Sequence, residues 1–287
     1  VINFNFFHLR SSNLTHINGT DSDKIKKINN FKSYKAFLKS KNIILEQEQR
    51  RNLIEKKIDN FCKSKKLKNK FNEKLIEEVV NLVEKPCVIM CKFDSMYLKI
   101  PEEILIITMQ HHQKYFPLFD GKGKLTNLFL LVANMEDKKG YIKEGNQRVI
   151  EARLSDARFF WEKNKNQSLV KQITKLKSLS FFNRLGTFYD RTQRLRKLSV
   201  LVSSQLNLIK DKVEIASSIC KADLVSDLVK EYPELQGVMG KYFALEQGFE
   251  NDVSLAISEH YLPIGISSEV PKKPISIAVA LIDKIDI

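Results

Sequence analysis

The chain of 287 residues carries 48 lysines and arginines against 34 acidic residues, a net charge of +14 at neutral pH. This surplus favours a polyanionic partner such as a nucleic acid, and no apolar run approaches the roughly 20 residues of a membrane-spanning helix. Of the four cysteines, Cys87 and Cys91 have a Cys-x3-Cys spacing, but no second Cys or His pair lies nearby to complete a zinc site, so we expect free thiols in a reducing cytoplasm. Because the chain starts with Val1 and stops abruptly, we expect a fragment with about two domains.

The positive charge is concentrated between Lys24 and Lys74, where 17 lysines and arginines accompany 5 acidic residues. Such a stretch suits RNA phosphates. A solvated lysine face would give the same pattern, as would a bias of the whole sequence toward Lys, Asn and Ile, and both stay open. The residues before this stretch show no clear period, so we expect a surface loop over 1–23.

The first half of the chain mixes helical and strand-like periodicity. The expected helices cover 33–40, 46–57, 72–83 and a segment that begins at Pro101. The first is capped by Asn30 or Ser33, and the third by Asn72. The expected strands cover 43–45 and 87–91. Because helices and strands do not alternate strictly, the fold class predicted for this half is α+β.

The stretch 111–162 organises that half. Apolar runs at 114–119 and 128–133 flank Asp120-Gly121, a strong hairpin signal. A helix is expected after Gly145-Asn146, since apolar residues recur there at helical spacing. The aromatic residues of the stretch are expected in the core rather than as base-stacking platforms; they are Tyr115, Phe116, Phe159, Phe160 and Trp161.

From residue 166 onward the periodicity is almost entirely helical, after a polar, linker-like segment at 163–168. The expected helices cover 169–179, 195–202, 215–229, 236–245, 252–257 and 275–285. Asp252 is expected to cap the fifth. We therefore predict two domains, an α+β domain over 1–165 and an all-α domain over 166–287.

Motifs for catalysis are missing. Gly121-Lys122-Gly123 lacks the rest of a phosphate-binding loop, which argues against ATP binding there. Adjacent His111 and His112 would point about 100° apart on a helix and so could not easily share a metal.

Four segments resemble the beta subunit of bacterial heterotetrameric glycyl-tRNA synthetase. They read HHQKYFPLFDGKGKL, LLVANME, GNQRVIEARLSDARFFWE and FFNRLGTFYDRTQRL. The resemblance implies ATP-dependent attachment of glycine to tRNA-Gly, with ATP and Mg²⁺ used at the alpha subunit. For this chain it implies no catalytic residue and no cofactor. It also implies a tRNA-binding role, an alpha2beta2 tetramer and a cytoplasmic location away from membranes. Thr15-His16 resembles a further family segment, although Asn18 and Gly19 depart from it.

The resemblance also implies that the helical half is HD-like. Active HD phosphohydrolases hold a metal with a His-Asp pair, a further His and a distal Asp. Here Lys221 and Ala222 precede Asp223, and Asp283 matches the distal aspartate. We expect these degenerate positions to bind no metal, with Asp223 paired to Lys221, Lys241 or another base.

Arginine suits phosphate by bidentate donation and can stack on unpaired bases. The candidate tRNA-binding residues are Arg148, Arg153, Arg158, Arg184, Arg191, Arg194, Lys221 and Lys241. Several are expected to form structural pairs, such as Arg148 with Glu151 and Arg194 with Asp190. Two functions of other classes stay open: an HD-type metal-dependent phosphohydrolase, against which the missing His-Asp pair argues, and a non-catalytic basic scaffold.

Overall fold

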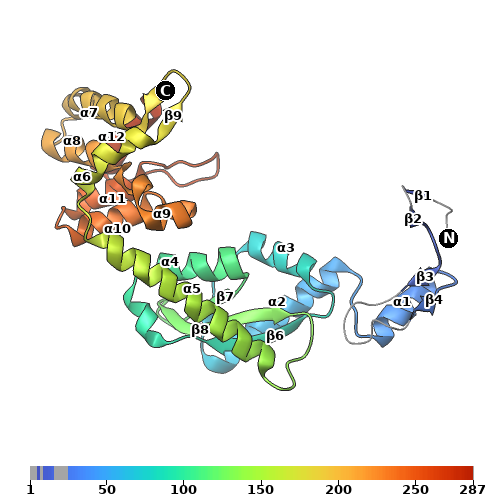
Figure 1. The fold of residues 1–287 in the computed structure, drawn as a ribbon. Helices are drawn as coiled ribbons and strands as arrows, with labels where there is room; N and C mark the ends of the chain where they lie inside the picture. Colours follow the sequence, from blue (N-terminus) through green and yellow to red (C-terminus); the bar gives the residue numbers. More distant parts are fainter. Residues whose placement is uncertain (1–4, 7–8, 16–24, 287) are drawn as a thin grey trace. The chain divides into compact units, whose positions relative to one another are not determined.

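The structure, a computed structural model, describes residues 5–6, 9–15 and 25–286, and their contacts divide the chain into two compact units. The first unit holds the residues up to Lys92 together with Lys114–Gln147. The second holds Phe93–Gln113 together with the residues from Arg148 onward. Figure 1 shows strands and helices mixed in the first unit and helices predominating in the second. The division by contacts does not test whether the chain folds as two independent domains, so the expected domain boundary at 165/166 stays a prediction.

A four-stranded antiparallel sheet with strand order β5-β7-β8-β6 forms the centre of the first unit. Its strands are β5 (Lys68–Asn69), β6 (Cys87–Lys92), β7 (Phe116–Phe119) and β8 (Leu125–Ala133). The predicted strand at 87–91 and the predicted hairpin are thus confirmed. In the turn, Asp120 Oδ1 accepts hydrogen bonds from the backbone N–H groups of Lys122 and Lys124, both at 2.9 Å. Gly123 has φ +82°, a conformation that favours glycine.

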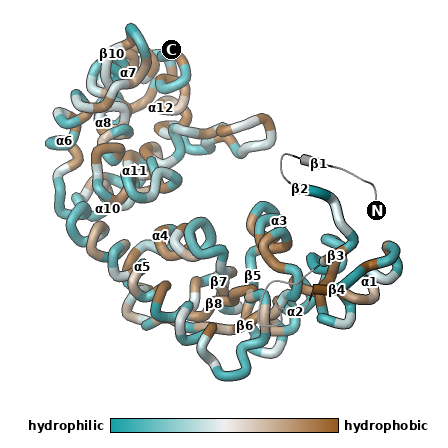
Figure 2. The backbone as a smooth tube through the Cα atoms, turned by 45° about the vertical axis from the view of Figure 1, so that its right-hand side comes forward, coloured by the Kyte–Doolittle hydropathy of each residue, from teal (hydrophilic) through white to brown (hydrophobic). Residues whose placement is uncertain are grey.

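Helices α2 (Gln47–Lys65) and α3 (Glu73–Leu82) pack on this sheet and share one apolar core with it. Ile54 and Ile76 of the helices are fully buried there, as is Leu130 of β8. Figure 2 shows the corresponding hydrophobic residues along α3 and the strands. Full burial of such a side chain stabilises the fold by about 1.5–3 kcal/mol, so this core accounts for the position of both helices.

The N-terminal part of the first unit contains short strand pairs and a capped helix. The strands are β1 (Asn5–Phe6), β2 (Leu9–Arg10), β3 (Leu14–Thr15) and β4 (Lys26–Lys27). β1 pairs with β2 and β3 with β4, so the expectation of loop alone over 1–23 is wrong for the described residues. The His16 segment lies outside them. Helix α1 (Phe31–Ser40) begins with a capping box, since Asn30 accepts from the Ser33 N–H and Ser33 from the Asn30 N–H.

The second unit is built mainly from helices. They are α4 (Glu102–Ile107), the later part of α5 (Tyr141–Lys165), α6 (Leu169–Gln172), α7 (Phe188–Gln205), α8 (Lys210–Ile219), α9 (Asp227–Glu231), α10 (Val238–Glu246), α11 (Asn251–Glu259) and α12 (Pro274–Ile285). Helix α11 packs against α8, α10 and α12. Trp161 of α5 stacks on Phe243 of α10 with 5.7 Å between ring centroids. Next to it, the Tyr242 hydroxyl donates to Glu103 of α4 at 2.8 Å.

Several expectations differ from the structure. Of the helix expected over 169–179, only α6 is α-helical, and Ile173–Ser178 form a 3-10 helix. α5 begins at Tyr141 rather than after Gly145-Asn146, because the Asp137 carboxylate accepts the N–H groups of Ile142 and Lys143 and so satisfies the first turn. Residues 43–45 form no strand, although the Ile44 N–H donates to the Glu84 carbonyl. The helix expected over 215–229 is broken into α8, a 3-10 turn and α9. Glu250, not Asp252, occupies the N-cap position of α11.

A short hairpin of β9 (Ser180–Phe182) and β10 (Gly186–Thr187) interrupts the helical half and was not predicted. With this exception, strands in the first half and helices in the second are confirmed. Among the helices that the structure describes, none is long and apolar enough to cross a bilayer.

Candidate nucleic-acid interface

Three predicted RNA-binding arginines, Arg148, Arg153 and Arg158, lie exposed on α5. Successive members are five residues apart, which turns each side chain about 140° around the helix from the last. The three guanidinium groups therefore point in different directions. They cannot all meet one flat surface, and each has to be considered with its own neighbours.

Arg148 shares its side of α5 with an exposed aromatic residue. Phe159 follows about three helical turns later on the same face, and it is 63% exposed. Exposed Ala152 and Ser155 lie between them on that face. We call these four residues the α5 strip. A guanidinium and a ring separated by small side chains offer single-stranded RNA a phosphate contact and a stacking surface.

The α5 strip corrects one expectation about the aromatic residues. Phe159 was expected in the core, but no other element covers it. The expectation is confirmed for Tyr115, Phe116 and Trp161, which are buried, while Phe160 is half-buried. Periodicity identifies the residues on one helix face, but it does not tell which face the rest of the fold covers.

Arg184 lies at the tip of the β9–β10 hairpin and is exposed. Its φ of +68° is in the left-handed region, which a non-glycine residue adopts only when the surrounding turn imposes it. Two residues earlier, Phe182 is 66% exposed. An arginine and an aromatic ring thus stand together on the surface a second time, in an element that the sequence did not predict.

Arg191 and Arg194 bind acidic residues of the C-terminal helix region. Nε and Nη2 of Arg194 lie 2.6 and 3.0 Å from the two carboxylate oxygens of Asp286. Nη2 of Arg191 lies 3.0 Å from Asp283 Oδ1 and donates to the Asp283 backbone carbonyl at 2.8 Å. The expected ion pair of Arg194 with Asp190 is not formed. Asp190 instead caps α7, where hydrogen bonds lower the pKa of its carboxyl.

Lys221 joins the same network from the interior. Its side chain is 2% exposed, and Nζ lies 3.0 Å from Asp283 Oδ1. The ammonium also lies 4.0 Å from the centroid of the Tyr261 ring, a cation–π distance. This burial leaves Lys221 no surface for an RNA phosphate. Lys241, by contrast, is half-buried on α10, with Nζ 5.1 Å from the Tyr242 ring centroid.

Asp223 is buried, but it does not pair with Lys221 or Lys241, so that expectation is wrong. Its Oδ2 accepts hydrogen bonds from the backbone N–H groups of Gly237 and Gly240 at 2.6 and 3.0 Å. Burial raises the pKa of Asp223 to about 6, against the opposing effects of these two N–H groups and of Lys221. A Cβ at position 240 would lie 3.1 Å from Oδ2, so glycine permits the close approach.

His260 belongs to the same buried region. Its Nδ1 lies 2.7 Å from the Ile257 carbonyl oxygen. Burial, and then the charge of Lys221, lower the pKa of His260 well below its usual range, so the imidazole is neutral. Within the described part of the chain, no group of three or more His, Cys, Asp or Glu side chains could hold a metal ion. Asp223 and Asp283 are engaged as stated above.

Part of the basic stretch in the first unit serves the fold itself. Arg50 donates to the backbone carbonyls of Ile44, Leu45 and Val80 at 2.8 to 3.0 Å, which joins α2 to the end of α3. Arg51 pairs with Glu73 of α3 at 2.9 Å. The two arginines of the stretch are therefore structural, and its lysines supply the exposed charge.

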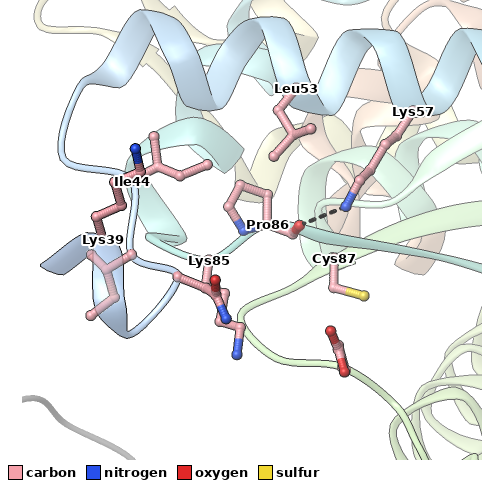
Figure 3. Close-up of a pocket in the computed structure, with 10 residues that line it drawn as sticks. Lys39, Ile44, Leu53, Lys57, Lys85, Pro86 and Cys87 are labelled. Carbon is pink, nitrogen blue, oxygen red and sulfur yellow. Dashed lines mark hydrogen bonds between the residues drawn. The ribbon is translucent and has the colours of Figure 1, made fainter.

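A basic pocket of about 420 Å³ lies beside these helices, and sequence reasoning did not identify it. Lys39, Lys57 and Lys85 line it, together with one acidic residue, Glu136, and apolar residues such as Leu53 (Figure 3). Lys57 donates to the Pro86 carbonyl at 3.2 Å, so one of the three ammonium groups is already engaged. The basic stretch signalled Lys39 and Lys57, whereas only folding brings Lys85 beside them.

Comparison with known proteins gives one consistent result. The family model described as "Glycyl-tRNA synthetase beta subunit" matches residues 1–287. Relatives include the glycine–tRNA ligase beta subunits of Thermodesulfovibrio yellowstonii, 38% identical over 99% of this chain, and of Syntrophomonas wolfei, 36% identical over 99%. The beta subunit of Polaromonas naphthalenivorans is 40% identical over 75% of the chain.

The matched region is only part of each relative. It covers 42% of the proteins from Thermodesulfovibrio and Syntrophomonas and 31% of the one from Polaromonas. The match nevertheless extends over both units, including the hairpin, α5 and the ion network of Asp283. The chain belongs to the glycyl-tRNA synthetase beta subunit family.

Proposed function

We propose that this chain is a segment of a glycine–tRNA ligase beta subunit that binds tRNA-Gly and supports ATP-dependent glycylation at an alpha-subunit active site. The observation that carries the proposal is the family match across all 287 residues. The net charge of +14 agrees with an RNA partner, because each phosphate contact releases condensed counterions. The catalytic step belongs to the alpha subunit in this proposal, and no residue of this chain takes part in it.

The proposed tRNA contacts are the exposed candidates, Arg148, Arg153, Arg158 and Arg184, with Lys241 at the margin. Exposed aromatic rings accompany Arg148 and Arg184, which supports contact with unpaired bases as well as phosphates. For Arg191, Arg194 and Lys221 we propose a supporting role, since Asp283 and Asp286 neutralise their charge.

We further propose that the helical half is an HD-like domain that begins near residue 166 and has no hydrolase centre. The buried ammonium of Lys221 supports this, because a cation paired with Asp283 would repel a divalent metal ion at the same carboxylate. ATP and Mg²⁺ are proposed to act only at the alpha subunit. The proposed assembly is an alpha2beta2 tetramer in the cytoplasm.

A binding assay with this chain tests the proposal directly. Fluorescence anisotropy with tRNA-Gly and with a non-cognate tRNA, across a salt series, should show binding that weakens linearly on a log–log plot against salt. In a charging assay with ATP, glycine and tRNA-Gly, the chain alone should form no glycyl-tRNA. Turnover by the chain alone, or no tRNA binding at low salt, would refute the proposal.

A further inference from the structure

A second basic pocket lies in the second unit, and none of the residues that line it is among the predicted RNA contacts. It measures about 510 Å³ and is walled by the end of α5, the 3-10 helix Ile173–Ser178 and the start of α9. Four lysines and one aspartate line it, together with polar residues; the charged ones are Lys163, Lys175, Lys177, Lys230 and Asp227. We call these four lysines and Asp227 the lysine pocket. Its excess of three positive charges suits a phosphate group.

Hydrogen bonds of buried and half-buried groups hold the walls of the lysine pocket in place. Asn164, which is 2% exposed, accepts the Leu228 N–H at 2.9 Å and so joins the end of α5 to the start of α9. Gln247 donates to the Gln167 carbonyl and accepts from the Leu169 N–H, both at 2.9 Å. The backbone that carries the lysines is therefore held in place, while the ammonium groups remain in water.

The four lysines are not equivalent. Lys163 Nζ lies 2.7 Å from Asp227 Oδ2, and this hydrogen bond lowers the pKa of the Asp227 carboxyl. Lys177 lies 4.8 Å from the Tyr189 ring centroid. Lys175 and Lys230 are exposed and form no ion pair with the residues that the structure describes. A phosphate between these two would gain charge-assisted contacts without breaking an existing ion pair.

We propose that the lysine pocket is a subsite for RNA backbone phosphate. Lys175 and Lys230 are its main contacts, whereas the ion pair with Asp227 keeps Lys163 from binding a phosphate. This inference rests on the proposed function and adds a contact region formed by other residues than the arginine candidates. A pocket of this size accommodates a nucleotide unit of a chain rather than a single ion. Lysine supplies charge without the fixed geometry of arginine, so the subsite holds the backbone and does not read bases.

The test uses tRNA-Gly binding by the chain and three variants across a salt series. Lys175→Ala/Lys230→Ala should weaken binding several-fold at low salt and reduce the log–log salt slope by about 1–2, roughly one for each phosphate that is no longer neutralised. Asp227→Asn should have the opposite effect, since it frees Lys163. The matched control is Lys197→Ala/Lys210→Ala, which removes two exposed lysines outside the pocket and should leave the slope unchanged. Far-ultraviolet circular dichroism checks that all variants fold.

Equal affinity and slope for the chain and Lys175→Ala/Lys230→Ala, with tRNA binding otherwise intact, would overturn the pocket and leave the proposed function standing. An equal loss in the control variant would also overturn it, because the effect would then be general electrostatics. Absence of tRNA binding by the unchanged chain would refute both. Inorganic phosphate and ATP serve as competitors. Displacement of tRNA by ATP at concentrations far below those required of phosphate would assign the pocket to a free nucleotide.

Discussion

Replacing Asp283 with asparagine should destabilise the second unit more than any other single charge removal in the ion network. The carboxylate pairs with Lys221 and Arg191, each at 3.0 Å, and Lys221 is almost completely buried. Removing one partner of a buried ion pair leaves an uncompensated charge and costs about 3–5 kcal/mol. Lys221→Met should cost only about 1–2 kcal/mol, because Asp283 keeps Arg191. The double variant should be more stable than Asp283→Asn alone.

Urea unfolding followed by tryptophan fluorescence measures this directly, since Trp161 is the one tryptophan and is buried against Phe243. Asp211→Asn is the control, because Asp211 is exposed and should change the unfolding free energy by no more than about 0.5 kcal/mol. A loss below about 1 kcal/mol for Asp283→Asn would refute the reasoning. Strict additivity of the two single variants would also refute it, because residues in one network should couple.

Three further predictions concern other parts of the chain. The pKa of Asp223, raised to about 6 against an ordinary value near 4, means that its stabilising contribution is complete below pH ~4 and lost as the pH rises through 6. Between pH 4.5 and 7, the difference in unfolding free energy from urea titrations should therefore shift in favour of Asp223→Asn by about 2 kcal/mol, and a constant difference would contradict this. An aromatic disulfide reagent should react quickly with half-buried Cys87 alone, because burial shields the other three thiols and raises their pKa. The Cys87→Ser variant should therefore lose the fast phase of the reaction, and a fast phase that remains would contradict this prediction. Phe159→Ala should weaken tRNA binding by about 1–3 kcal/mol in anisotropy titrations. Phe31 is equally exposed, and Phe31→Ala should leave the affinity unchanged. Equal losses of affinity in the two variants would argue against RNA binding by the α5 strip.

Local signals predicted the elements whose stabilising contacts are close in the sequence. The Asn30 capping box and the Asp120 turn each involve residues within four positions, so residue type was enough to place them. The strand at 87–91 followed from an unbroken apolar run. The break after Ile219 was missed because the periodicity continues through it, while the Asp223 contacts with Gly237 and Gly240 come from further along the chain.

The candidate site was less predictable for the same reason. Arginine-rich segments were identified, but the partner of Arg194 is 92 positions away, and no spacing rule points to Asp286. Lys221 was placed at the degenerate metal position by resemblance, yet its burial depends on α12 and Tyr261. The lysine pocket combines three segments whose lysines are ordinary surface residues when taken singly. These lysines come together only in the folded chain, where the Asn164 hydrogen bond joins two of the segments.

The division of the chain into two units has a topological consequence for how it is made and cut. The polypeptide leaves the first unit after Lys92, returns at Lys114, and leaves it again inside the continuous helix α5. Cleavage of any one peptide bond therefore leaves at least one fragment with residues of both units. On the ribosome, β6 emerges well before β8, its sole neighbour in the sheet, and Phe93–Gln113 emerge before the helices of their own unit. Neither unit can therefore complete its fold until a later segment of the chain has been synthesised, and in both cases a part of the other unit is synthesised first.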